Sequence, residues 1–132
     1  DKTLEIDLDG AAKCIEAAEK ASVSRFILVS VMGADNRNAW DSSSIKPYMI
    51  AKHYADRILK NSSLDYSIIR PGSLTDDNGT GKINTSPSSG SQHKIPREDV
   101  ASVISACIDN TVTTNSIIEF VSGDTPIDEA IL

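Results

Sequence analysis

The chain has 132 residues, of which 39% are hydrophobic and 24% are charged, and this balance predicts one modest globular domain. Its formal net charge of −6 and its scattered Lys and Arg residues argue against nucleic acid as a partner, because phosphate binding needs a concentrated basic surface. No apolar run reaches membrane-spanning length and the acidic first residues do not resemble a secretory signal, so we expect a cytoplasmic protein with no membrane partner.

The first predicted elements are a helix, a buried strand and a loop. Residues 9–21 are rich in alanine at helical spacing, which indicates a helix. Residues 25–31, "RFILVSV", form a continuous apolar run that ends before Gly33, which is typical of a strand buried on both faces. The polar stretch 33–46 is long enough to be a functional loop. Within it, Trp40 either covers a substrate or anchors the loop to the core, and the second role is the more favoured.

The next element, "KPYMIAKHYADRILK" at residues 46–60, has the periodicity of a surface helix with one residue out of place. Its stripe of apolar or small residues consists of Tyr48, Ala51, Ala55, Ile58 and Leu59. Lys52 lies inside this stripe, one turn after Tyr48. A buried lysine is costly unless it is paired, so a ligand or a carboxylate partner would explain its position.

The rest of the chain continues the alternation of strands and helices. Residues 64–72, "LDYSIIRPG", predict a second buried strand, and residues 73–94 predict a loop rich in Ser, Gly and Thr. A third helix is expected at 96–110, a third strand at 116–123 and a short final helix at 125–132, with Thr125 as its N-cap. This order predicts an α/β fold with a parallel sheet.

In such a sheet, ligands bind beyond the carboxyl ends of the strands. The first strand ends at Ser30, and the second ends at residues 70–74. The helix after the first strand begins at this same edge, which places Tyr48 and Lys52 there as well. We therefore predict a binding cleft at this edge, with loop 33–46 beside it.

A tyrosine and a lysine four residues apart share one helix face, and their chemistry can be complementary. A nearby ammonium favours the phenolate and lowers the pKa of the phenol. Such a tyrosine can protonate a carbonyl oxygen while hydride arrives at the carbon. Two plainer interpretations stay open, because lysine stems often lie along apolar stripes and Tyr48 could belong to the core.

Cysteine and histidine give no pattern typical of a metal site. Cys14 and Cys107 lie far apart, each in a helical pattern, and we expect both to be small buried hydrophobes rather than a disulfide or metal pair. His53 and His93 are distant from each other and lack a third ligand nearby in sequence. We therefore predict no metal.

The segments "RFILVSVMGAD", "YMIAK", "LDYSIIRPGSLTDDNGTGKI" and "IPREDVASVI", in this order, resemble the second half of the atypical short-chain dehydrogenase/reductase family. The resemblance covers nearly the whole chain and is greatest to single-domain NAD(P)-binding proteins called NAD-dependent epimerase/dehydratase-like or NmrA-like. It implies a Rossmann-like fold and NAD or NADP as cofactor.

The resemblance also implies roles for individual residues. Tyr48 matches the catalytic acid or base, and Lys52 matches the lysine that lowers its pKa and binds the nicotinamide ribose. Ser30 would contribute a catalytic hydroxyl, although the family usually has two adjacent serines and here the pair is Ser30-Val31. The turn that faces the nicotinamide would consist of Arg70, Pro71, Gly72, Ser73 and Leu74.

The family begins with a strand and a glycine-rich turn that holds the dinucleotide pyrophosphate, and nothing upstream of residue 26 matches this pattern. We therefore expect residues 1–132 to be the C-terminal part of one NAD(P)-binding domain, completed by an N-terminal half, a partner segment or a homodimer. Two functions stay open. One is an NAD(P)-dependent oxidoreductase or epimerase acting on a small carbonyl or hydroxyl compound, and the other is a non-catalytic dinucleotide-binding sensor or regulator.

Overall fold

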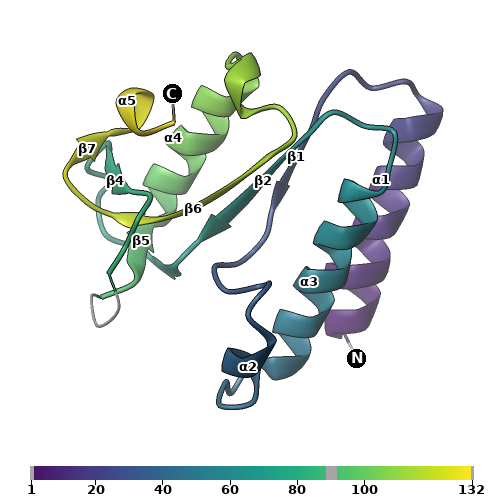
Figure 1. Cartoon of the computed structure of the whole chain (residues 1–132), viewed down its shortest axis with the longest axis horizontal. Coiled ribbons are helices and arrows are strands. Elements are labelled where there is room, and N and C mark those ends of the chain that lie inside the picture. Colours follow the sequence, from purple (N-terminus) through teal and green to yellow (C-terminus); the bar gives the residue numbers. More distant parts are fainter. Residues whose placement is uncertain (1, 89–91, 132) are drawn as a thin grey trace.

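The computed structural model describes residues 2–88 and 92–131, and it shows a twisted sheet with helices on both sides (Figure 1). The main sheet has the strand order β1-β2-β6-β4-β7. Its parallel part consists of β1 (Phe26–Val29), β2 (Tyr66–Pro71) and β6 (Ser116–Ser122). These are the three predicted strands, so the predicted α/β fold with a parallel, Rossmann-like sheet is confirmed.

Short strands extend this sheet in ways that the sequence did not predict. β4 (Lys82–Asn84) pairs antiparallel with both β6 and β7 (Thr125–Pro126). A separate parallel pair is formed by β3 (Ser73–Thr75) and β5 (Lys94–Pro96). The prediction of one loop over residues 73–94 is therefore wrong for its described part, while residues 89–91 lie outside the described residues. Strands of two or three polar-rich residues are too short to show periodicity.

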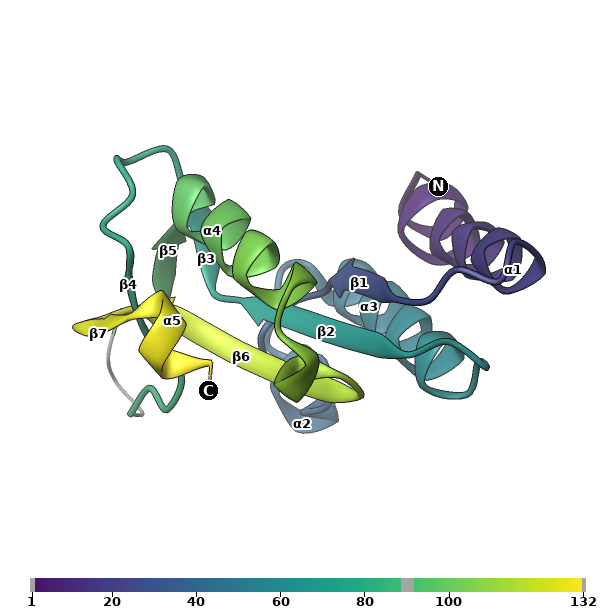
Figure 2. The same ribbon diagram turned by 90° about the horizontal axis from the view of Figure 1, so that it is seen from above.

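One face of the sheet is covered by two helical segments that run side by side (Figures 1 and 2). The first combines a π-helix, η1 (Thr3–Gly10), with α1 (Ala11–Lys20), and the second is α3 (Lys46–Lys60). Helical structure thus begins earlier than the predicted residue 9. Leu4, Ile6 and Leu8 alternate along the chain rather than following a helical stripe, so periodicity gave no helical signal there.

The opposite face is covered by α4 (Arg97–Ile108), which leads into the short 3-10 helix η2 (Thr111–Thr113) (Figure 2). The chain ends in α5 (Ile127–Ala130). This helix begins later than expected, and Thr125 is not its N-cap, because Thr125 and Pro126 pair with β4 as strand β7. One more short helix, α2 (Arg37–Trp40), lies within the predicted loop between β1 and α3.

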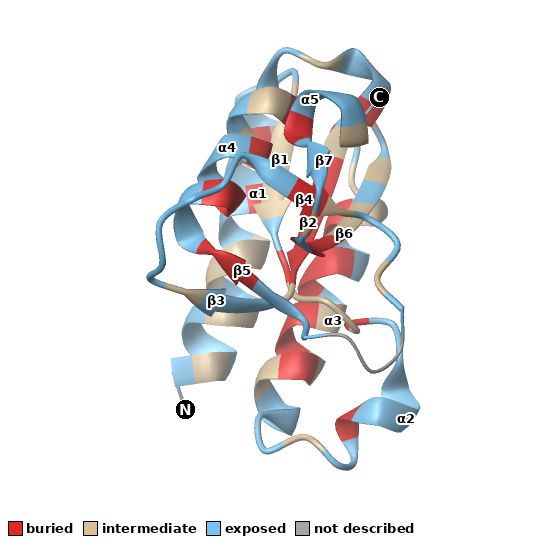
Figure 3. Cartoon of the chain, turned by 90° about the vertical axis from the view of Figure 1, so that its left-hand side faces the viewer, coloured by how far each residue is buried: buried red, intermediate tan, exposed pale blue. Residues whose placement is uncertain are grey.

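Each face of the sheet has its own apolar core, and buried residues form bands along α3 and the central strands (Figure 3). The core beneath α4 includes Ile69, Val103, Cys107 and Phe120. The core beneath α1 and α3 consists of Ile15, Ala18, Leu59, Leu64 and Ile68. Ile58, which the pattern places on the buried stripe of α3, is instead exposed.

The two cysteines differ in environment. Cys107 is buried, as predicted, whereas Cys14 is exposed, and both are free thiols. The prediction for Cys14 is wrong because the residues of α1 that the core covers are Ile15 and Ala18, and this cover does not extend to Cys14. Within residues 2–88 and 92–131, no group of three or more His, Cys, Asp or Glu side chains could hold a metal ion. Across the same residues, every helix is too short or too polar to cross a membrane.

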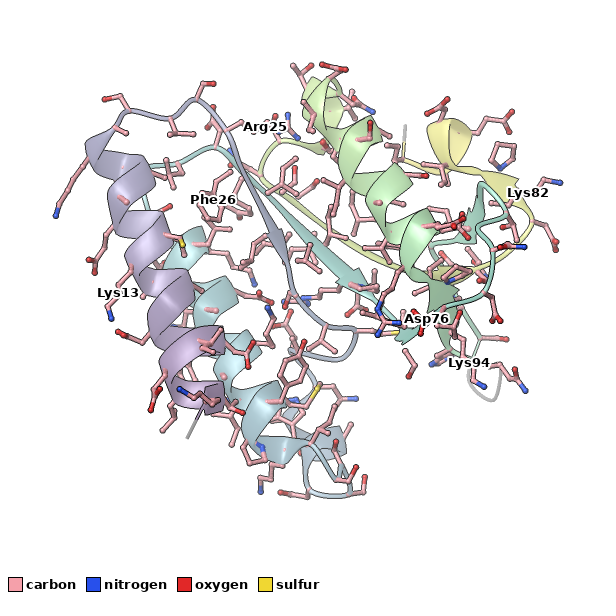
Figure 4. All side chains as sticks on the ribbon, turned by 180° about the vertical axis from the view of Figure 1, so that it is seen from behind. Lys13, Arg25, Phe26, Asp76, Lys82 and Lys94 are labelled. Atoms are coloured by element: carbon pink, nitrogen blue, oxygen red, sulfur yellow. The ribbon has the colours of Figure 1, made fainter. Side chains whose placement is uncertain are left out.

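Arg25 fastens the amino end of β1 to the segment that follows α4. Its guanidinium donates to Ser67 Oγ at 2.7 Å, to Thr114 Oγ1 at 3.0 Å and to the Asn110 carbonyl at 3.2 Å. Figure 4 places Arg25 beside one end of α4 and Asp76 near the other. This arrangement leaves the carboxyl ends of β1 and β2 as the end of the sheet where loops can form a site.

Candidate functional site

A cavity of about 450 Å³ lies beyond the carboxyl ends of β1 and β2, beside the first turn of α3. It is where the strand-edge rule predicts a cleft. Predicted site residues in its lining are Ser30, Tyr48, Pro71, Gly72, Ser73 and Leu74. Lys52 and Arg70 do not line it. Residues that the sequence did not single out as site residues also contribute, and these are Val29, Val31, Met32, Gly33, Ala39, Ser43, Ile45, Met49 and His93.

Ser30 stands at the point where β1 ends and is almost fully buried. Its backbone N–H donates to the Ile69 carbonyl at 2.6 Å, which continues the β1–β2 ladder by one residue. Its hydroxyl donates to Asp56 Oδ2 at 2.8 Å. Since a hydroxyl has a single proton, Ser30 Oγ presents lone pairs, and no proton, to the cavity in this arrangement.

Tyr48 is half-buried in the first turn of α3. Burial raises the pKa of its phenol above the ordinary value, and the negative charges of Asp7 and Asp56 raise it further. The expected lowering of this pKa by Lys52 is therefore wrong for this structure. Asp7 comes from η1, which packs beside α3, and no sequence pattern indicated that it would lie near the tyrosine.

Lys52 is only 8% exposed, and its ammonium donates to the Val29 carbonyl at 2.6 Å. Burial lowers the pKa of Lys52, while the charges of Asp56 and Asp7 act in the opposite direction. The lysine is thus held behind the cavity wall, on the backbone of a residue that lines it. Because an ammonium has three protons, donors remain beyond the one given to Val29.

Asp56 is the main residue that sequence reasoning missed. It is 0% exposed, and its Oδ2 atom accepts hydrogen bonds from Ser30 Oγ, from Arg70 Nε at 3.1 Å and from Arg70 Nη2 at 2.9 Å. Its Oδ1 atom is buried without a partner among the described residues. Burial raises the pKa of Asp56, and its bonds to Ser30 and Arg70 partly offset this. The available signal was its spacing, four residues after Lys52 on the same stripe.

Arg70 belongs to this buried network rather than to the cavity lining. Besides Asp56, its guanidinium binds Asp35 Oδ2 at 2.7 Å and lies 3.8 Å from a Glu119 carboxylate oxygen. Arg70 holds the pKa of Asp35 below its usual value. Its side chain therefore neutralises carboxylates behind the site, and only the turn that follows it reaches the cavity.

The loop after β1 is fixed at Gly33. This residue has φ +83°, a conformation that favours glycine. Its N–H donates to Glu119 Oε2 at 3.0 Å, and its carbonyl accepts from Trp40 Nε1 at 3.1 Å. Trp40 is buried, bonds to its own loop and also lines the cavity, so it holds the loop and forms part of the cavity wall at the same time.

The turn after β2 is packed against neighbouring backbone. Gly72 N–H donates to the Phe120 carbonyl at 3.0 Å, and Ser73 N–H donates to the His93 carbonyl at 2.8 Å. A Cβ on Gly72 would lie 2.5 Å from the His93 carbonyl oxygen, so only glycine fits there without displacement. This turn forms a rigid wall of the cavity.

Comparison with known proteins gives consistent matches. The family model described as NAD(P)H-binding matches residues 1–111. The chain is 49% identical over 131 residues to the Bacillus subtilis protein named uncharacterized sugar epimerase YhfK. This match covers 99% of the chain and 60% of the Bacillus subtilis protein. Among solved structures, a putative NAD-dependent epimerase/dehydratase from Bacillus halodurans is similar, with a TM-score of 0.91, 43% identity and coverage of 99% of this chain and 61% of that one. The oxidoreductase ylbE from Lactococcus lactis has a TM-score of 0.88, 37% identity and the same coverage, 99% and 61%. The chain thus spans about 60% of the length of the curated relative.

Proposed function

The chain belongs to the NAD(P)H-binding family, and from this membership we propose that its cavity is the nicotinamide and substrate end of an NAD(P)-dependent oxidoreductase or epimerase/dehydratase-like site. The substrate would be a small carbonyl or hydroxyl compound. The observation that carries the proposal is the meeting of Ser30, Tyr48 and the turn at residues 71–74 around one cavity.

The residues present fit the nicotinamide end of a dinucleotide. Pro71 and Leu74 offer an apolar wall, and the turn is held in place by its own backbone bonds. Lys52 has protons left for ribose hydroxyls, one turn from Tyr48. The pyrophosphate has no comparable place, because within the described ranges no glycine-rich turn leads from a strand into a long helix.

For this reason we also propose that residues 1–132 are the C-terminal part of the domain and that the phosphate-binding turn comes from other residues. Within the described chain β1 pairs with β2 alone, so the backbone groups of Ile27 and the N–H of Val29 point to the open side of β1, while the Val29 carbonyl already accepts from Lys52. Val29 is exposed at this edge. An additional strand would pair there, and a free edge of this kind is otherwise prone to association.

In the proposed reaction, a carbonyl compound, NAD(P)H and a proton give an alcohol and NAD(P)⁺. Lys52 and the turn at residues 71–74 would hold the nicotinamide end of the dinucleotide, which would supply a hydride for the carbonyl carbon. Tyr48 supplies the proton to the oxygen, and its raised pKa keeps the phenol protonated at neutral pH. Lys52 orients the site through the Val29 carbonyl.

The test is carbonyl reduction by the full-length protein, followed through NADPH absorbance with a panel of small ketones and aldehydes. Tyr48→Phe removes the proton donor but keeps the ring, so we expect a loss of roughly 100-fold or more in rate with little change in NADPH affinity. Tyr54→Phe, at an exposed tyrosine of the same helix, is the matched control. Unchanged reduction in Tyr48→Phe would exclude the proposed acid. NADPH binding without turnover of any compound would instead favour the sensor, the second candidate, which the departure at Val31 supports.

A further inference from the structure

The lining of the cavity carries few charges. Among the described residues that form it, none is Asp, Glu, Lys or Arg. Its apolar side chains include Val31, Met32, Trp40, Ile45, Met49 and Leu74, and they outnumber the polar ones, which are Ser30, Ser43, Tyr48, Ser73 and His93. A phosphorylated or carboxylated ligand would lose its hydration here without gaining an opposite charge from these residues, and a sugar would bring its hydroxyls against a mainly apolar wall. The wall therefore suits a neutral ligand with a mainly apolar body.

The polar group at the deep end of the cavity has a fixed direction. Ser30 gives its only proton to Asp56 at 2.8 Å. Asp56 is completely buried and is held by two hydrogen bonds from Arg70, so its carboxylate cannot rotate away from Ser30. The Ser30 proton therefore stays in the hydrogen bond to Asp56. A hydrogen bond to a carboxylate is about twice as strong as one between neutral groups, so Ser30 keeps this orientation when a ligand enters.

Resting on the proposed function, we infer that the cavity takes a neutral, mainly apolar alcohol, with Ser30 accepting a hydrogen bond from its hydroxyl and Asp56 acting as the positioning residue that holds Ser30 as an acceptor. The matching ketone has no proton to offer Ser30, so it binds through Tyr48 alone. After reduction, the proton that Tyr48 delivers to the oxygen is the one donated to Ser30. The site thus holds the alcohol more tightly than the ketone.

The experiment measures binding rather than turnover. Trp40 lines the cavity, and its indole N–H gives a signal in the ¹H–¹⁵N NMR spectrum that is identified as the one lost in Trp40→Phe. The protein, without dinucleotide, is titrated with cyclohexanol and cyclohexanone as an alcohol–ketone pair, and with glucose and glucose 1-phosphate as polar and anionic probes. No hydride transfer is possible under these conditions, so the result does not depend on catalysis.

The measured quantity is the ratio of ketone Kd to alcohol Kd, compared between variants because the two probes also differ in hydrophobicity. Ser30→Ala removes the acceptor, and we expect the ratio to fall about 3- to 10-fold, the range typical of one lost hydrogen bond. Asp56→Leu removes the oxygen that takes the Ser30 proton, so Ser30 becomes free to donate, and the ratio falls at least as far. Ser102→Ala, on exposed α4 surface, leaves the ratio at its original value. Neither glucose probe shifts the indole signal at the concentrations where cyclohexanol does.

An unchanged ratio in Ser30→Ala overturns the inference, and so does tighter binding of glucose 1-phosphate than of cyclohexanol. A ratio that falls in Ser30→Ala but not in Asp56→Leu removes the positioning role of Asp56. If Asp56→Leu does not fold, the comparison of the original protein with Ser30→Ala decides alone. The expected ratios combined with absence of hydride transfer in the reductase assay would support this inference while refuting the proposed redox function.

Discussion

Replacing Arg70 with methionine tests whether the buried network behind the cavity determines stability. The substitution keeps an apolar stem but removes the charge, which leaves Asp56 fully buried with Ser30 as its remaining donor. Removing one partner of a buried ion pair costs about 3–5 kcal/mol. Asp35 loses a partner too, but its carboxylate is exposed enough for water to replace the bond. Since the free energy of unfolding of a domain of this size is about 5–15 kcal/mol, Arg70→Met removes a large share of its stability.

The dependence on pH gives this prediction a second measurable part. The pKa of Asp56 is raised by burial, and Arg70 lowers it again through its hydrogen bonds and charge. Without Arg70 the pKa rises further, so the folded state binds a proton that the unfolded state lacks. The stability of the variant therefore falls as the pH rises through the pKa of Asp56 in the folded state, and the stability is regained when the pH is lowered again. We expect the deficit of Arg70→Met to be smaller at about pH 5 than at about pH 7.

Thermal and urea unfolding at these two pH values provide the assay, and the loss at neutral pH corresponds to roughly 10–20 °C in Tm. Arg97→Met is the matched control, because Arg97 pairs with Asp76 on the surface and its loss should cost less than about 1 kcal/mol. The double change Asp56→Asn with Arg70→Met removes both charges and should cost less than Arg70→Met alone. If Arg70→Met is as mild as Arg97→Met, or the double change is the more damaging, the reasoning about the buried pair fails.

Three further predictions concern the phenol, the turn and the loop before β4. Carbonyl reduction should stay level between about pH 7 and 9, because the raised pKa keeps Tyr48 protonated, and a steep fall there would contradict this. Gly72→Ala should cost about 1–3 kcal/mol in chemical unfolding, since its Cβ would meet the His93 carbonyl; no loss would mean that the turn yields freely. Asp99→Ala should lower the free energy of unfolding by about 1.5–3 kcal/mol, because this buried carboxylate accepts hydrogen bonds from two backbone N–H groups. Glu98→Ala loses one exposed hydrogen bond and should cost under about 1 kcal/mol. Equal losses in the two variants would refute this distinction.

The parts of the fold that could be predicted are those with a long repeated pattern. Apolar runs gave β1, β2 and β6, and the helical stripe gave the observed bounds of α3. Strands such as β4 and β7 are held by a partner far along the chain and contain too few residues for any pattern. The same limit applies to η1, whose apolar residues alternate although the segment is helical.

The site divides in the same way. The strand-edge rule predicted that Ser30, Tyr48 and the turn at 71–74 would meet, and the structure brings them around one cavity. Asp56 was missed because a carboxylate on a helix is usually a surface group, and only Arg70, on the neighbouring strand, makes its burial tolerable. The raised pKa of Tyr48 was missed because it depends first on the burial of the phenol and then on the charge of Asp7, and both come from packing that no sequence pattern showed.

The residues around the cavity fall into two groups, a hydrogen-bonded frame and a set of apolar lining side chains that can be exchanged. The frame consists of strand ends, the Gly33 and Gly72 backbones and the ion pairs of Arg70. Met32, Ile45 and Leu74 line the cavity with side chains that form no hydrogen bonds. A change among these three alters the shape offered to a ligand and leaves the supporting bonds in place. Proteins sharing this architecture can thus diverge in what they accept through a few apolar substitutions, without rebuilding the chemistry beneath.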